Sequence, residues 1–142
     1  NIMSADGPSI FTRIVHGEIP CHRVYEDEHV LAFLDIGPLA PGHVLLIPKT
    51  EYRTLDQVPP DTAAALGAVL PKLVAAVQQA TGSAGVNILQ NNGQVAGQEV
   101  LHVHFHIIPR AEGDGLGYRW QPKSYAEGKA EQMRDKLIAL LA

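Results

Sequence analysis

The chain has 142 residues, of which 46% are hydrophobic and 18% charged, and its formal net charge at pH 7 is -4. This length and composition predict one globular domain with a hydrophobic core. The acidic balance and the absence of a lysine and arginine cluster argue against a nucleic-acid-binding groove. The single cysteine, Cys21, excludes an intramolecular disulfide and a cysteine-rich zinc module.

No apolar run approaches the roughly 18 to 20 residues of a membrane span, and the first residues lack the regions of a signal peptide. We therefore expect a cytoplasmic protein that binds neither a membrane nor nucleic acid. Residues 1–8 are interpreted as a flexible N-terminal lead-in, and residues 9–142 as a single domain.

The N-terminal half alternates strand and helix signals. Ser9 is a candidate N-cap for a short helix that Gly17 ends. The predicted strands span 23–26, 30–34 and 43–48. The strongest helix signal runs from Asp61 to Ala80, and its interior proline, Pro71, predicts a kink or a break.

The C-terminal half adds a strand over 85–90, a polar loop over 91–98 and a strand that begins at His102 and ends at Pro109-Arg110. Residues 112–122 are glycine-rich and predicted to be irregular, and Ser124-x-x-Glu127 is a capping box for a helix to about Leu141. Several joins are too short for parallel crossovers. The sequence therefore predicts an α+β fold, an antiparallel sheet of about five strands with flanking helices.

The most informative segment is His102-Val-His104-Phe-His106, followed by two isoleucines. In an extended strand these three histidines share one face, while the apolar residues between them face a core. Imidazoles accept protons, attack electrophiles and bind metals near neutral pH. A row of them predicts that this strand carries the chemistry.

Three interpretations fit the row. Two histidines on one strand face can bind a metal, although no carboxylate follows within a few residues. One imidazole can act as a nucleophile on phosphorus or on an acyl carbon. The third interpretation is a surface strand without chemistry. The preceding loop favours the nucleophile, because Gly97 permits close backbone approach and Asn91 and Gln98 offer amide donors for anionic oxygens.

These residues resemble the histidine triad family, whose signature is three histidines alternating with apolar residues. The resemblance extends to the loop before the triad, to Ile-Pro-Arg after it, and to several segments from Ile10 onward, so that it covers about residues 9–110. The matching segments are similar to bacterial members, and the compact domain favours the nucleotide-binding branch over the dinucleoside polyphosphate branch. The resemblance implies the family's fold and a homodimer.

The resemblance implies a hydrolase without a cofactor. His104 would attack the α-phosphorus of a nucleotide conjugate and form a covalent nucleotidyl-histidine, with the carbonyl of His102 holding its inner nitrogen. His106 would stabilise charge and assist proton transfer, and His43 would support the cluster. The substrate would be a purine nucleoside 5'-phosphoramidate or a related conjugate.

The resemblance also implies the binding residues. Phosphate-binding positions are Asn91, Gly97, Gln98 and Glu99. Asp35 would accept hydrogen bonds from the ribose, and the apolar walls around the base would be Ile10, Phe11, Ile14, Phe33 and Ile36. Each of these apolar residues is also typical of plain core, and Asp35 of a turn.

Some positions depart from the family pattern. Zinc-bearing bacterial relatives have two cysteines and a histidine where this chain has Ser9, Thr12 and Glu51, so we expect no structural zinc, and Cys21 is misplaced to replace them. Glu99 stands where many nucleotide-binding relatives have serine. Its carboxylate would repel a phosphate but favour a cationic leaving amine.

Alternative functions stay open at this point. They are a dinucleoside polyphosphate hydrolase, a nucleotide-binding regulatory module with little activity, and a metal-dependent enzyme or metal-storage protein. The family's C-terminal segment often reaches the partner's active site, which makes Trp120 and the loop from Gly113 to Gly117 candidate contributors across a dimer interface.

Overall fold

The computed structural model describes residues 7–117 and 120–142. The expected lead-in therefore lies mostly outside the described residues. The helices are α1 (Ile10–Val15), α2 (Pro60–Thr81) and α3 (Lys129–Leu141), with short 3-10 turns at Leu55–Gln57 and Gln94–Ala96. The strands are β1 (Arg23–Glu26), β2 (Val30–Leu34), β3 (Val44–Pro48), β4 (Gly85–Gln90) and β5 (Phe105–Arg110).

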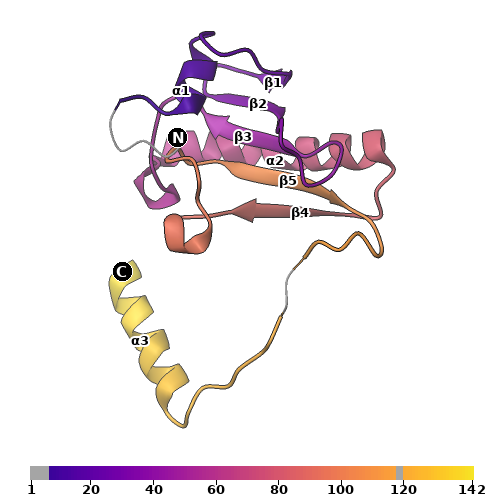
Figure 1. The fold of residues 1–142 in the computed structure, drawn as a ribbon. Coiled ribbons are helices and arrows are strands. Elements are labelled where there is room, and N and C mark those ends of the chain that lie inside the picture. The colour runs from indigo at the N-terminus through magenta and orange to yellow at the C-terminus, as the bar shows by residue number, and fades with distance from the viewer. Residues whose placement is uncertain (1–6, 118–119) are drawn as a thin grey trace.

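The five strands form one sheet in the order β1-β2-β3-β5-β4 (Figure 1). Every neighbouring pair is antiparallel, which confirms the predicted α+β class. The order matters for function, because β5 lies between the central strand β3 and the edge strand β4, so both flank the end of the histidine segment.

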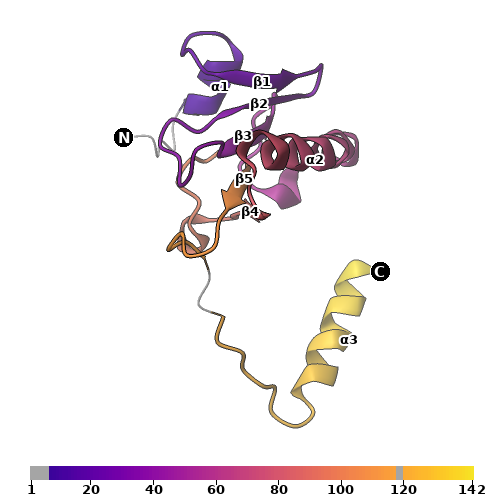
Figure 2. The ribbon, with the colours of Figure 1, turned by 90° about the vertical axis from the view of Figure 1, so that its right-hand side faces the viewer.

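Strict alternation of side chains divides the core between the two faces of the sheet. On one face, Val44 and Leu46 of β3 pack with Leu66 and Val69 of α2. On the other face, Leu45 and Ile47 pack with residues of α1. Figure 2 shows α1 and α2 on opposite sides of the strands. The short helix α1 thus covers the face on which His106 lies, because His106 pairs with Leu45.

Helix α2 corrects two expectations. Its 22 residues have the length and hydropathy of a membrane span, contrary to the sequence reading. However, Leu66, Val69, Leu73 and Val77 are buried against the sheet, which makes it a core helix. The helix also runs through Pro71 without the break that was one of the two outcomes predicted there. It ends at Thr81, and Gly82, with a left-handed φ of 66°, is its C-cap.

The histidine strand begins later than predicted. β5 starts at Phe105, and neither β3 nor β4 pairs with a residue before it. Instead the backbone N–H of Val103 donates to the carbonyl of Tyr52 at 2.7 Å. His102 and His104 therefore precede the ladder, and the three histidines are not one regular row.

The last helix also begins later than predicted. Its N-cap is Gly128, and neither member of the expected capping box at Ser124 and Glu127 caps it. Both views show α3 away from the sheet (Figures 1 and 2). All its residues are exposed in the single chain. Its large exposed apolar residues are Met133, Leu137, Ile138, Leu140 and Leu141.

Candidate active site

A cleft of about 350 Å³ opens on the α1 side of the sheet and contains the predicted chemistry. His104 and His106 line it, and Ile10 and Phe11 of α1 form one wall. The other lining residues are Ile10, Phe11, Asp35, Ile36, Leu39, Leu45, Leu89, Asn91, Gly97, Glu99 and Val100. Chain segments far apart in sequence thus converge on two imidazoles.

One hydrogen bond determines which nitrogen of His104 is available. Nδ1 of His104 lies 2.7 Å from the backbone carbonyl of His102. A carbonyl only accepts, so Nδ1 carries the proton and donates. In the neutral ring Nε2 then keeps the lone pair. His104 is thereby arranged as a nucleophile or base through Nε2.

A second pair of bonds assigns the proton of His106. The N–H of Leu39 donates to Nδ1 of His43 at 3.1 Å, so the proton of neutral His43 is on Nε2. That Nε2 lies 2.9 Å from Nδ1 of His106 and donates to it. The proton of His106 is therefore on Nε2. The cleft presents a lone pair on one ring and an N–H on its neighbour, with ring centroids 4.9 Å apart.

Burial keeps these rings neutral. It lowers the pKa of His104 and of His43, in each case as the dominant cause. Burial lowers the pKa of His106 to about 4, and the neighbouring His104 and His43 contribute in the same direction. Neutral imidazoles are therefore the dominant forms at pH 7, and the hydrogen-bond directions above apply there.

His102 differs from the other two histidines of the triad because it has no access to the cleft. Its side chain is fully buried and does not line the cleft. Its Nε2 lies 2.9 Å from the carbonyl of Pro48 and its Nδ1 lies 2.8 Å from Oγ of Ser9. Phe11 contacts the rings of both His102 and His104 edge to face. His102 is thus fixed from two sides, directly beside the carbonyl that holds His104.

The loop before the triad divides its predicted residues. Asn91, Gly97 and Glu99 line the cleft. Gln98 does not, because it is buried and its amide bonds the N–H of Gly93 and the carbonyls of Arg53 and Val100. The side chain of Gln98 shapes this loop, and its amide donors are directed at the protein's own backbone.

The apolar residues predicted around the base also divide. Ile10, Phe11 and Ile36 line the cleft, and Ile36 is 88% exposed at its rim. Ile14 and Phe33 belong instead to the core beneath α1.

Asp35 lies at the cleft with one oxygen committed to a turn. Oδ1 accepts from the N–H of Gly37 at 2.9 Å, and Oδ2 lies 3.7 Å from Nε2 of His43.

Sequence reasoning missed four apolar lining residues, Leu39, Leu45, Leu89 and Val100. Leu45 and Leu89 are the direct partners of His106 on the two neighbouring strands. The strand order would have identified both, since residues in register share a face. The backbone N–H of Leu39 donates to His43 only because of the fold of its loop, so no side-chain pattern in the sequence predicts this bond.

Asp35, His43 and His106 are close enough to hold a metal ion, since their ligand atoms all lie within 4.8 Å of one another. Coordination through Nε2 of His43 would need a lone pair there. The N–H of Leu39 already requires the single lone pair of neutral His43 to be on Nδ1. The donor set therefore does not fit a metal without breaking that bond.

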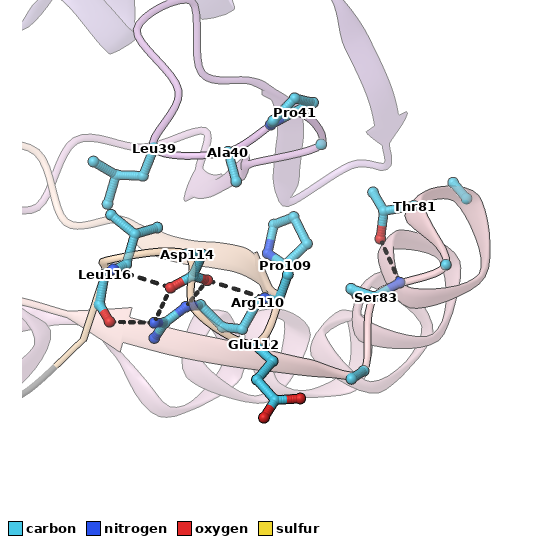
Figure 3. A pocket seen from close by; sticks show the side chains of 15 residues that line it. Leu39, Ala40, Pro41, Thr81, Ser83, Pro109, Arg110, Glu112, Asp114 and Leu116 are labelled. Atoms are coloured by element: carbon cyan, nitrogen blue, oxygen red, sulfur yellow. Dashed lines mark hydrogen bonds and ion pairs between the residues drawn. The ribbon is translucent and has the colours of Figure 1, made fainter.

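A larger hollow of about 920 Å³ lies among the end of α2, the loop before β3 and the turn after β5 (Figure 3). Its charged groups are largely engaged with one another. Arg110 bonds both carboxylate oxygens of Asp114 at 2.8 Å and also bonds Asn87 and the carbonyl of Leu116. This hollow shares Leu39 with the histidine cleft, and no histidine lines it.

Comparison with known proteins agrees with this geometry. A family model of the HIT domain matches residues 16–113. The chain is 55% identical over 106 residues to a HIT-like protein of Methanocaldococcus jannaschii, covering 75% of this chain and 81% of that one. It is 44% identical over 133 residues to the adenosine 5'-monophosphoramidase hnt1 of Schizosaccharomyces pombe, covering 90% and 97%.

A crystal structure of a HIT family member from Bacillus subtilis superposes with a TM-score of 0.89 at 40% identity. The match covers 94% of this chain and 96% of that one. The chain therefore belongs to the histidine triad family.

Proposed function

We propose that the protein is a nucleotide-binding hydrolase that cleaves a nucleoside 5'-phosphoramidate, or a related conjugate, at the α-phosphorus. The observation that carries the proposal is the pair of groups in one cleft, the Nε2 lone pair of His104 and the Nε2–H of His106. The name of the Schizosaccharomyces pombe relative supports this substrate class.

In the first step Nε2 of His104 forms a bond to phosphorus while the bond from phosphorus to the leaving nitrogen breaks. The departing nitrogen takes a proton from solvent and leaves as the neutral amine, because a neutral imidazole is too weak an acid to supply that proton. The Nε2–H of His106 stays on its ring and donates a hydrogen bond to the phosphoryl oxygens, where negative charge accumulates. His104 becomes a nucleotidyl-imidazolium, and the neutral ring of His106 lies 4.9 Å from it between centroids.

In the second step water attacks the same phosphorus and the bond to Nε2 of His104 breaks. The proton that water releases passes to solvent, which restores the starting state with both rings neutral. The hydrogen bond from His43 to Nδ1 of His106 holds that ring in place throughout. Splitting one displacement into two steps lets one imidazole supply the nucleophile and its neighbour a hydrogen-bond donor without a cofactor.

The nucleoside would occupy the α1 side of the cleft. Ile10, Phe11 and Ile36 provide apolar surface for the base. The Oδ2 atom of Asp35 is the acceptor for the ribose hydroxyls, because Oδ1 is engaged by Gly37. Asn91 and the backbone at Gly97 face the phosphate from the loop before the triad.

The direct test mixes the protein with adenosine 5'-phosphoramidate in the presence of a chelator, followed by rapid quenching and mass spectrometry of the 102–106 peptide. The expected result is turnover with an adenylyl adduct on His104. His104→Ala should lose turnover by at least about 10³-fold and form no adduct, because it lacks the nucleophile. A folded parent with neither turnover nor adduct would contradict the proposal.

Glu99 gives the cleft a preference among leaving groups. Its carboxylate lines the cleft and acts electrostatically on His104, raising that residue's pKa against the larger effect of burial. A negative charge there opposes an incoming phosphate and attracts a positive charge. We propose that Glu99 selects a leaving group that carries a cationic amine, such as the amino acid of an aminoacyl or lysyl adenylate.

Glu99→Ser should therefore lower kcat/KM for a phosphoramidate with a cationic side chain by about fivefold relative to a neutral one of equal size. This corresponds to about 1 kcal/mol, as expected for one partly solvated charge pair. Glu99→Gln is the matched control, since it removes the charge and keeps the shape. Equal changes for both substrates would rule out this role.

We also propose that the protein is a homodimer. Helix α3 has 13 residues and exposes five large apolar side chains in the single chain. A helix of this length is marginally stable in water unless an apolar face is packed. Trp120 is 81% exposed in the single chain and is the aromatic candidate to reach a second copy.

Light scattering after size exclusion should give twice the mass of one chain. The mass of one chain at all concentrations tested would contradict the homodimer.

A further inference from the structure

Three oxygen-bearing side chains converge on the buried ring of His102. Ser9 Oγ lies 2.8 Å from Nδ1 of His102, Thr12 Oγ1 lies 3.4 Å from it, and Oε1 of Glu51 lies 3.9 Å from it. Ser9 is the N-cap of α1 and Thr12 lies in its first turn, whereas Glu51 follows β3. The ring therefore joins two segments that are remote in sequence.

The family resemblance implies that zinc-bearing relatives have ligands at these positions, and the residues present here do not fit zinc. Structural zinc sites use thiolates and imidazoles, whereas this cluster has two neutral hydroxyls and one carboxylate. The hydroxyls are also engaged: Ser9 Oγ accepts from the N–H of Thr12 at 3.0 Å, and Thr12 Oγ1 donates to Glu51 at 2.6 Å.

The direction of each hydrogen bond follows from one fixed point. Nε2 of His102 lies 2.9 Å from the carbonyl of Pro48, which only accepts, so the proton of His102 is on Nε2. Nδ1 therefore accepts, and Ser9 Oγ donates to it. Thr12 Oγ1 donates a hydrogen bond to Oε1 of Glu51, which also accepts from the backbone N–H of Ser9 at 2.7 Å.

We propose that Ser9, Thr12 and Glu51 form a metal-free clamp that fixes His102 and thereby positions the nucleophile His104. The clamp fixes the His102 ring through a hydrogen bond to its Nδ1. The backbone carbonyl of the same residue accepts the hydrogen bond from Nδ1 of His104. Glu51 is a positioning residue within it and touches no substrate. The proposal rests on the proposed function for its kinetic consequence.

The clamp acts on His104 by a second route through α1. Glu51 anchors the start of α1 by accepting from Ser9 N, and the same helix carries Phe11. The Phe11 ring lies edge to face with His104, at 5.0 Å between centroids. Loss of the anchor frees both the helix and the ring that packs against the nucleophile.

Two measurements test the clamp, the imidazole ¹⁵N shifts of His102 and the kinetics of phosphoramidate hydrolysis. In Ser9→Ala and Glu51→Ala, the Nδ1 resonance of His102 should move toward that of a nitrogen without a hydrogen bond. In both variants kcat should fall by about tenfold, as for loss of a group that orients a catalytic residue, with KM little changed. Ser9→Thr and Glu51→Gln keep the donor and the acceptor and should recover most of both properties.

Asp27→Ala is the matched control. Asp27 also accepts two backbone N–H groups and a hydroxyl, but in the β1–β2 turn, so its loss perturbs the fold without touching His102. If Glu51→Ala fails to fold, Thr12→Val removes one hydroxyl at nearly constant volume and should show the same shift.

Parent-like ¹⁵N shifts in Ser9→Ala and Glu51→Ala would overturn the proposal, as would an equal loss of kcat in Asp27→Ala. The ¹⁵N measurement needs no turnover. An inactive parent would therefore count against the proposed function, while the clamp would still be decided by the shifts.

Discussion

The structure depends on the hydrogen bond between Nδ1 of His104 and the carbonyl of His102, which lie 2.7 Å apart. Because a carbonyl cannot donate, this bond places the proton on Nδ1 and leaves Nε2 as the only lone pair of the neutral ring. The low pKa of His104, caused chiefly by burial, keeps the ring neutral. A backbone atom thus does for this imidazole what a carboxylate does in many other catalytic sites.

The rest of the fold serves to hold this bond and its counterpart at His106. The order β3-β5-β4 places His106 between Leu45 and Leu89, which flank it from the two neighbouring strands. The loop before β3 contributes the N–H of Leu39, which sets the proton on His43 and, through it, on His106. Two effects therefore act together on the adjacent rings of His104 and His106. Burial disfavours their charged forms, and hydrogen bonds fix which nitrogen of each ring carries the proton.

Much of the fold was predictable because short-range patterns and tertiary structure agree. The strands over 30–34 and 85–90 and the helix that Ser9 caps match the sequence reading. The capping box at Ser124 failed because Gly128, with its left-handed φ of 76°, begins the helix instead. The histidine strand was placed too early because pairing depends on neighbours, and Val103 bonds Tyr52 rather than a strand.

The candidate site was predictable where a residue type is rare and its placement local, as for His104 and His106. It was not predictable where a long-range contact decides the role. The sequence predicts that the side-chain amide of Gln98 donates a hydrogen bond to an anion. In the structure that amide donates instead to the carbonyl of Arg53. In the sequence, Glu51 indicates only that a zinc ligand of the family pattern is missing. The fold shows that it lies beside His102 and accepts hydrogen bonds from Ser9 and Thr12.

The most direct test of this account is the ¹⁵N spectrum of the imidazoles of His43, His104 and His106 in the unliganded protein at pH 7, assigned by substitution of each histidine in turn. The account predicts three neutral rings, with the proton on Nδ1 in His104 and on Nε2 in His43 and His106. A proton on Nε2 of His104, or a cationic His106, would contradict it.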